Sequence, residues 1–162
     1  MVPIESEEKS TRAHDAYRVP FHELLEIRPI AWAEGRGRIE MTVRAHHLRS
    51  LGIMHGGVAA TLLDTVMGIA AGTMTPPDHY VVTAQLNVNF IRPAWEGEAL
   101  VATSEVRHAG RQTAVVRGEI HTAAGALVAS GSGTFFFVPH SDQTRGRIER
   151  HEDRPIAIAD QE

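Results

Sequence analysis

Cysteine is absent from the 162-residue chain. Its absence excludes disulfide bonds, zinc sites built from thiolates and cysteine nucleophiles. An excess of basic residues is also missing, because the net charge is −4 at pH 7. A chain of this charge lacks the positive field with which proteins bind nucleic acid, so we expect no nucleic-acid partner.

Long apolar runs are absent as well. The longest apolar region, around residues 58–74, is interrupted by Asp64 and by several small residues, so it is too short to span a bilayer. The charged first 15 residues contain no apolar segment of the kind found in signal peptides. We therefore expect a cytoplasmic protein without a membrane partner.

Several motifs of cofactor and nucleophile chemistry are missing. The ten histidines form no HExxH pattern, and the adjacent pair His46-His47 would point apart in an extended segment. There is no G-x-S-x-G elbow, no P-loop and no dinucleotide fingerprint, and the serines of segment 130–133 fall in a strand-like region. We expect no metal and no bound cofactor.

The hydrophobic pattern predicts one domain with a short helix, two strands, a long helix and four further strands. We expect a polar N-terminal segment at 1–19, a folded domain at 20–138 and a charged C-terminal tail at 139–162. The predicted elements are a helix at 21–27, strands near 27–33 and 38–44, a helix at 57–72, and strands at 80–91, 99–108, 112–121 and 127–138.

The long helix is apolar almost all round, so a sheet must wrap it. This predicts an α+β domain in which an antiparallel sheet curves around one central helix, which is the hotdog arrangement. Small residues at six helix positions either allow close packing or leave a groove for an acyl or aryl group. These positions are 59, 60, 68, 70, 71 and 72.

Asp64 is the single carboxylate in that helix, nine residues after His55. A charge there is costly unless it is paired or solvated. It either caps a group or reaches a subunit surface, or it serves as an acid, base or nucleophile. The His55-Gly56-Gly57 turn likewise either shapes and caps the helix start, or presents amides to a carbonyl or oxyanion.

Helix geometry separates the two candidate groups. Seven residues at 1.5 Å per residue place Gly57 and Asp64 about 10 Å apart along the axis. A short aspartate cannot span that distance. If both act on one substrate, they must come from different copies of the chain, as in a symmetric dimer with antiparallel central helices.

Residues 51–65 (LGIMHGGVAATLLDT) resemble the signature of hotdog-fold acyl-CoA thioesterases of the PaaI-like type. The resemblance extends over roughly residues 20–138. It continues in the segments 82–94 (VTAQLNVNFIRPA), 97–98 (GE), 108–113 (HAGRQT) and 125–135 (GALVASGSGTF).

The resemblance implies hydrolysis of an aliphatic or aryl acyl-CoA at the interface of a homodimer or homotetramer. It places the acyl carbonyl on the Gly57 N–H, with His55 and Gly56 in the same turn. Asp64 of the facing subunit is then the general base or the nucleophile. Thr83 holds the lytic water or supports the carboxylate.

The resemblance also assigns two segments to the CoA moiety. The first segment contains Phe90, Ile91, Arg92 and Pro93, and the second contains His108, Gly110 and Arg111. Arg92 and Arg111 each have two interpretations: the side chain pairs with CoA phosphates, or it is a solvated surface charge.

One position departs from the family pattern. Many relatives carry asparagine six residues before the motif histidine, where this chain has Arg49. Arginine cannot accept a hydrogen bond, so it binds an anionic group or points to solvent. The alternative function is a non-catalytic module that binds acyl-CoA or acyl-carrier protein. A hydratase is disfavoured, because Ile69 occupies the position where its second catalytic residue would stand.

Overall fold

The computed structural model describes residues 19–141 and 144, so the predictions for 1–19 and 139–162 fall mostly outside the described residues. No helix in this part of the chain is long and apolar enough to cross a membrane. Helix α2 spans Pro20–Leu24, the 3-10 turn η1 spans Ala45–His47, and helix α3 spans Gly56–Gly72. The strands are β1 (Arg28–Ala33), β2 (Arg36–Thr42), β3 (His79–Phe90), β4 (Ala99–Ala109), β5 (Thr113–Thr122) and β6 (Leu127–Pro139).

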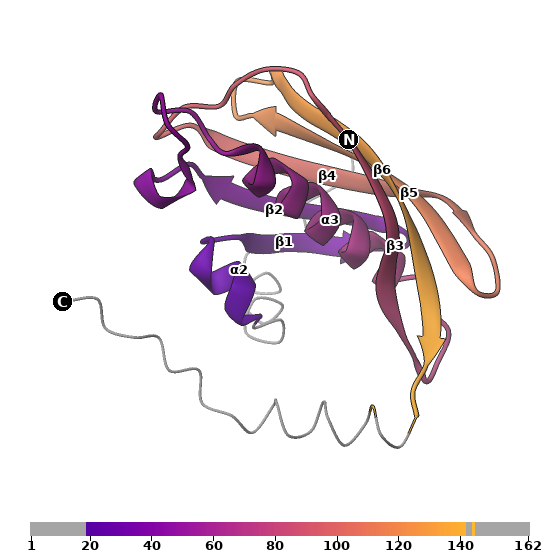
Figure 1. Ribbon diagram of the computed structural model, residues 1–162. Coiled ribbons are helices and arrows are strands. Elements are labelled where there is room, and N and C mark those ends of the chain that lie inside the picture. The colour runs from indigo at the N-terminus through magenta and orange to yellow at the C-terminus, as the bar shows by residue number, and fades with distance from the viewer. Residues whose placement is uncertain (1–18, 142–143, 145–162) are drawn as a thin grey trace.

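The six strands form one sheet in the order β1-β2-β4-β5-β6-β3, and every neighbouring pair is antiparallel. The sheet curves around α3, which connects β2 to the opposite edge strand β3 (Figure 1). The predicted α+β hotdog fold is therefore confirmed.

Helix α3 supplies the centre of the core. Its Leu62, Leu63, Val66 and Met67 side chains are at most 1 % exposed. Full burial of each such side chain contributes roughly 1.5–3 kcal/mol through the hydrophobic effect. The sheet covers them with large side chains from its inner face, including Ile39, Leu100 and Phe135.

The sheet does not close around the helix. Strands β1 and β3 are its two edges, and the side of α3 between them remains half-buried. The sheet predicted to wrap the helix leaves this strip uncovered, because an open sheet of six strands does not reach around the whole helix. The half-buried residues on it are Ala60, Thr61, Asp64, Thr65 and Gly68.

Two predicted boundaries need correction. Helix α2 ends at Leu24 rather than at residue 27, because Glu26 adopts a positive φ of 52° and Ile27 N–H returns to the His22 carbonyl at 2.8 Å. Strand β2 begins at Arg36 rather than 38. Glu34 and Gly35, with φ of 50° and 76°, form a two-residue hairpin turn of the type that suits twisted strands.

Gly37 lets β2 approach α3 closely. A Cβ atom there would lie 2.8 Å from the Val66 carbonyl oxygen and 3.0 Å from Ser104 Oγ, which donates to the same carbonyl. We expect Gly37→Ala to lower the free energy of unfolding by about 1–3 kcal/mol, the usual cost of overpacking. Urea unfolding measures this loss of stability. Gly72→Ala serves as the control, because nothing lies within 4 Å of a Cβ atom built on Gly72. Equal stability of both variants would contradict the close contact.

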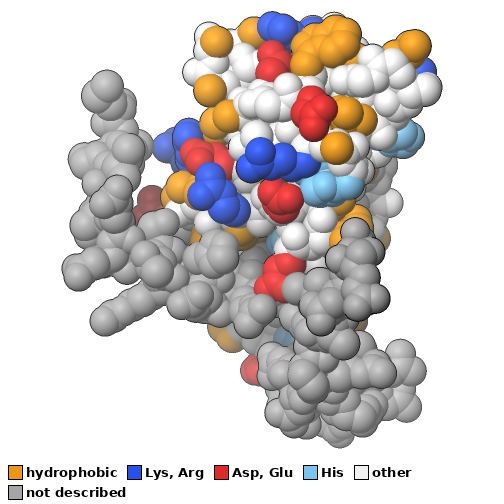
Figure 2. Space-filling model, turned by 90° about the vertical axis from the view of Figure 1, so that its left-hand side faces the viewer, with side chains coloured by type: hydrophobic (Ala, Val, Ile, Leu, Met, Phe, Trp, Pro, Cys, Tyr) orange, Lys and Arg blue, Asp and Glu red, His pale blue; other side chains and the backbone are white. Residues whose placement is uncertain are grey.

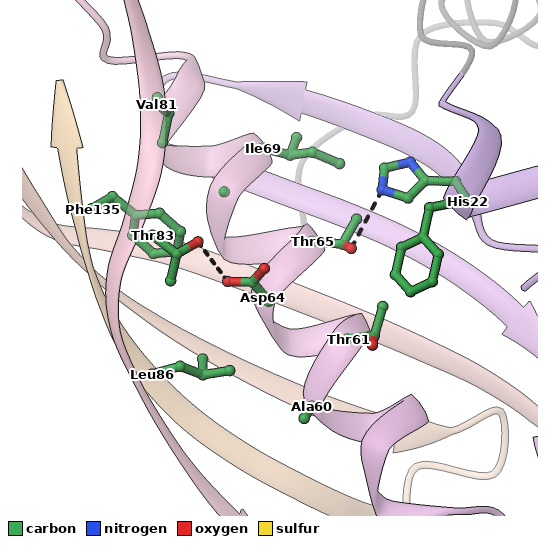
Figure 3. A pocket seen from close by; sticks show the side chains of 12 residues that line it. His22, Ala60, Thr61, Asp64, Thr65, Ile69, Val81, Thr83, Leu86 and Phe135 are labelled. Atoms are coloured by element: carbon green, nitrogen blue, oxygen red, sulfur yellow. Dashed lines mark hydrogen bonds between the residues drawn. The ribbon is translucent and has the colours of Figure 1, made fainter. Parts of the chain in front are cut away.

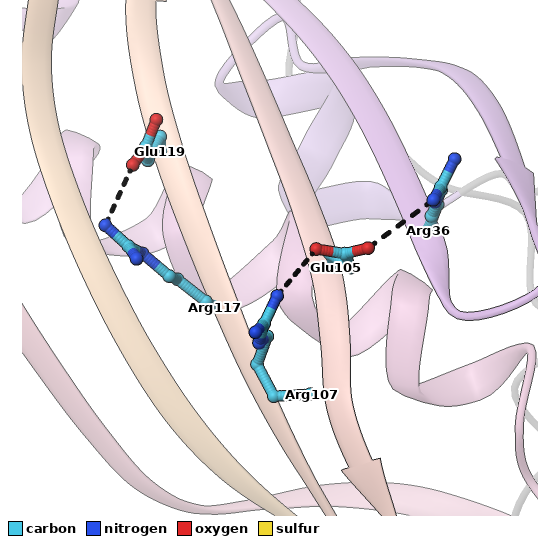
Figure 4. A network of polar contacts seen from close by, with 5 residues as sticks. All are labelled: Arg36, Glu105, Arg107, Arg117 and Glu119. Atoms are coloured by element: carbon cyan, nitrogen blue, oxygen red, sulfur yellow. Dashed lines mark hydrogen bonds and ion pairs between the residues drawn. The ribbon is translucent and has the colours of Figure 1, made fainter. Parts of the chain in front are cut away.

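The outer face of the sheet carries exposed ion pairs. Glu105 joins Arg36 at 3.4 Å and Arg107 at 3.0 Å, and Arg117 joins Glu119 at 3.2 Å (Figure 4). Exposed pairs of this kind contribute about 0–1 kcal/mol each.

On the face shown in Figure 2, acidic and basic side chains alternate instead of separating by sign, so neither sign dominates there.

Candidate active site

The start of α3 is capped by His55. Its Nδ1 accepts a hydrogen bond from the Gly57 N–H at 2.9 Å, while the His55 N–H donates to the His47 carbonyl at 2.8 Å. The capping interpretation of the His-Gly-Gly turn thus has direct structural support. The Gly57 amide that was predicted to bind a carbonyl already has an acceptor, which a substrate would have to replace.

Phe90 brings the end of β3 to this helix start. A Cβ atom on Gly56 would lie 3.4 Å from Phe90 Cε1, and the ring is still 63 % exposed. The following loop is held in place because Met54 N–H donates to the Ala94 carbonyl at 2.8 Å. The start of α3 and the end of β3 are therefore neighbours in the fold.

Asp64 lies in the middle of α3 and faces β3. Thr83 Oγ1 donates a hydrogen bond of 2.8 Å to Asp64 Oδ1 (Figure 3). The register of β3 against β6 shifts between Thr83 and Gln85, so a bulge stands beside this contact. One carboxylate oxygen is thereby oriented, and Oδ2 is left for another partner.

Asp64 and Thr83 open onto a cavity of about 520 Å³ between α2, α3 and β3 (Figure 3). Its volume is within the usual range for small-molecule sites, and its walls combine apolar side chains with a few polar groups. The apolar wall consists of Phe21, Ile69, Val81, Leu86 and Phe135, together with Ala60 and Gly68.

Sequence reasoning missed the contribution of α2 to this cavity. His22 Nε2 lies 3.4 Å from Thr65 Oγ1, one residue after the candidate carboxylate. Burial lowers the pKa of His22, so its ring is neutral near pH 7. Pro20 and the apolar spacing of residues 21, 24 and 25 predicted a helix here, but no sequence feature indicated that its side chains contact α3.

The small residues of α3 divide between the two alternatives that the sequence left open. Ala59, Ala70 and Ala71 are at most 2 % exposed and serve close packing. By contrast, Ala60 and Gly68 line the cavity beside Asp64. Packing and groove formation thus both occur along one helix.

The predicted CoA-binding residues lie at opposite ends of the subunit. Arg49 and segment 90–93 lie near the start of α3, since Arg49 N–H donates to Ile53 O at 2.9 Å and Phe90 reaches Gly56. The turn with His108, Gly110 and Arg111 lies near its other end: Gln112 accepts from Phe137, close to where β6 pairs with the start of β3. One chain does not bring Arg92 and Arg111 together.

His47 supports the helix start from beneath. Its ring is 1 % exposed, and Nδ1 accepts the Arg44 N–H at 3.0 Å. Burial, followed by the neighbouring His46, lowers the pKa of His47. The hydrogen bond from Arg44 requires a neutral His47 ring, because a protonated Nδ1 cannot accept a hydrogen bond.

This gives a prediction about pH. The pKa of His47 in the folded state is below its unfolded value near 6.5, so its contribution to stability is complete above pH 6.5. That contribution is lost as the pH falls below 6.5 towards the folded pKa, at up to about 1.4 kcal/mol per unit. Urea unfolding at pH 7.5 and 5.5 measures the loss. The drop should shrink in His47→Asn, and His22, whose pKa burial also lowers, contributes to the part that remains. An undiminished drop would exclude His47 as its source.

Within residues 19–141 and 144, no three His, Asp or Glu side chains gather in an arrangement that could hold a metal ion. The serines of segment 130–133 lie in β6, as the sequence predicted.

The comparisons with known proteins agree with this geometry. Residues 51–129 match the thioesterase superfamily model. Human acyl-coenzyme A thioesterase 13 is 31 % identical over 125 residues, covering 76 % of this chain and 86 % of that protein. Among solved structures, the PaaI protein of the Escherichia coli phenylacetic acid degradation operon has a TM-score of 0.73 at 28 % identity, covering 83 % and 94 % of the two chains. A conserved Pseudomonas aeruginosa protein gives 0.72 at 31 %, covering 78 % and 99 %.

The fold and these relatives together define a hotdog-fold thioesterase. The chain belongs to the thioesterase superfamily and is of the PaaI-like type.

Proposed function

We propose that this protein hydrolyses acyl-CoA thioesters to the free acid and CoA. The main support is the Asp64 carboxylate, which is oriented by Thr83 at 2.8 Å and faces a cavity of about 520 Å³. Relatives that carry the name acyl-CoA thioesterase add weight to this substrate class. We propose that the reaction uses only groups of this chain, without a metal or other cofactor.

The proposed reaction begins with a water molecule near Asp64. The carboxylate takes a proton from the water as its oxygen attacks the thioester carbonyl, which gives a tetrahedral oxyanion. The C–S bond then breaks, and the CoA thiolate takes the proton from Asp64. If the carboxylate instead attacks directly, an anhydride forms, which water hydrolyses to the same products. Thr83 fixes the rotamer of Asp64 in both cases.

The carbonyl is polarised by the N–H of Gly57. Because that group is bonded to His55 Nδ1 at 2.9 Å, the imidazole must turn away when a carbonyl or oxyanion arrives. The exchange replaces one hydrogen bond by another, so its net cost is small, about 1 kcal/mol or less. An oxyanion is the stronger acceptor, which favours the exchange in the transition state.

The two groups act from different subunits in this proposal. Gly57 and Asp64 lie about 10 Å apart along one helix, whereas an antiparallel pair of α3 helices can set each Gly57 opposite the partner's Asp64. The same pairing moves the 108–111 turn of one copy towards Arg92 and Arg49 of the other. A homodimer, or a tetramer built from two of them, would thereby unite CoA-binding residues that one chain keeps apart.

One observation favours a second candidate function. The Gly57 N–H is occupied by His55, and Arg49 takes the place of an assisting asparagine. A hotdog module that binds acyl-CoA or acyl-carrier protein without turnover would tolerate both features.

Thiol release, followed with a disulfide dye, separates the two. The panel contains short, medium and long aliphatic, phenylacetyl and hydroxybenzoyl thioesters of CoA. Turnover by the wild-type protein supports the thioesterase. Binding of CoA esters without any thiol release would favour the non-catalytic module, and Arg49→Asn would then be the next variant to test for gain of activity.

A further inference from the structure

A second cavity, of about 490 Å³, adjoins the first towards the C-terminal end of α3. Both cavities are lined by Gly68, Ile69 and Val81, so they are consecutive compartments of one groove. The groove runs along the uncovered side of α3 between the edge strands. Trp32 of β1 and Tyr80 of β3 line only the far compartment.

Three side-chain polar atoms around the far compartment are engaged in hydrogen bonds within the protein. Thr73 Oγ1 accepts the Gly35 N–H and donates to the Ala70 carbonyl, both at 2.7 Å. Thr75 Oγ1 donates to the Ala71 carbonyl at 3.3 Å, and His79 Nδ1 bonds the Pro77 carbonyl at 2.8 Å. No Asp, Glu, Lys or Arg is among the described residues that line it. The compartment therefore offers a ligand shape and carbon surface rather than charge.

We propose that the far compartment holds the distal part of an unbranched aliphatic acyl chain whose thioester lies at Asp64. This assignment rests on the proposed function. Under this assignment three residues determine the length of the acyl chain that fits. Gly68 and Ile69 lie where the two compartments meet, and Gly72 lies at the far end. A chain entering at Asp64 can pass from the first cavity into the second along the side of α3 that carries Gly68 and Ile69.

The length of the groove sets the expected substrate. Eight residues from Asp64 to Gly72 correspond to about 12 Å along the helix axis. An extended alkyl chain rises roughly 1.25 Å per bond, from a bond length of 1.52 Å, so about ten carbons fit. Each buried methylene should strengthen binding about fourfold until the groove is full. Acyl groups near ten carbons should therefore bind best.

Binding of two inert thioethers tests the tail site without turnover. S-decyl-CoA should bind the wild-type protein at least roughly 100-fold more tightly than S-butyl-CoA, from about fourfold per methylene. Gly72→Leu is chosen to narrow the far compartment, since Gly72 lines it and nothing lies within 4 Å of a Cβ at this position. We expect it to reduce the decyl-to-butyl affinity ratio at least tenfold, measured by calorimetry.

Two further variants complete the design. Gly72→Ala should shift the ratio less and in the same direction, which keeps the test valid if the leucine variant does not fold. Ala124→Leu adds the same side chain to the exposed β5–β6 turn and should leave the ratio within twofold.

Equal affinity for both thioethers, or a ratio that Gly72→Leu leaves unchanged, would overturn the tail site; a partner subunit filling the groove would give that result. If the ratios behave as expected but no acyl-CoA releases thiol, the proposed hydrolysis fails and the tail site stands.

Discussion

Asp64→Asn is expected to lower kcat for acyl-CoA hydrolysis by about 10²–10⁴-fold, the usual contribution of a positioned general base. Asparagine keeps the volume of the side chain and an oxygen that accepts the Thr83 hydroxyl, so the 2.8 Å contact can persist. It removes the charge that takes the proton from water. Initial rates of thiol release at saturating substrate measure the loss.

A matched control separates chemistry from charge and stability. Glu105→Gln makes the same kind of change on the outer face of the sheet, where Glu105 pairs with Arg36 and Arg107. Its rate should remain within twofold of the wild type. Urea unfolding of the Asp64 variant should give a stability equal to or above that of the wild type, because a half-buried charge has been removed.

Two other results for Asp64→Asn would contradict the expected role of this carboxylate. Full activity of Asp64→Asn would exclude this carboxylate as base or nucleophile. Loss of the folded state in the same variant would show that the Asp64–Thr83 contact is mainly structural, in line with the alternative that the sequence left open.

The fold was predictable because the hydrophobic pattern of the segments agrees with the need to cover the apolar helix. An apolar helix with a single carboxylate had to be covered, and the alternating segments around it could supply a sheet. Strand boundaries were displaced by one or two residues. The hairpin at Glu34-Gly35 shows why: two positive φ values shorten the turn, and β2 starts earlier than its alternation indicates.

The site was predictable only in part. Asp64 was identified as the lone carboxylate of an apolar helix and Thr83 by the family resemblance, and the structure brings the two into contact. The position of His22 beside Thr65 depends on how α2 packs on α3, and this tertiary contact has no local signature. The bond between His55 and Gly57 follows from helix capping, but sequence alone could not decide between a cap and an open amide.

Placement of the CoA-binding segments required the sheet register. Residues 90–93 and 108–111 are separated by about 15–20 positions in sequence, yet β4, which lies between them, places them near opposite ends of the domain; its 11 residues extend roughly 34 Å at 3.4 Å per residue. Sequence distance gave no indication of this separation. It supplies an independent reason to look for a second copy of the chain at each site.

Complementation between two inactive variants tests that arrangement. Asp64→Asn lacks the carboxylate, and Gly57→Leu should block the approach of a carbonyl to the helix start, since even a Cβ at this position lies 2.9 Å from His55 Nδ1. Each homodimer is expected to lose at least 100-fold in rate, consistent with loss of a base or of an oxyanion donor. The two are mixed in equal amounts, unfolded and refolded together.

In a mixed dimer with shared sites, one site receives both altered residues and the other receives neither. Random reassembly makes half of the dimers mixed, and half of their sites are intact, so about a quarter of the wild-type rate should return. A site built within one chain always retains its own defect, and mixing would then restore nothing. Recovery near a quarter therefore requires Gly57 and Asp64 to act from different subunits, whereas a rate equal to the mean of the two variants contradicts the proposed dimer.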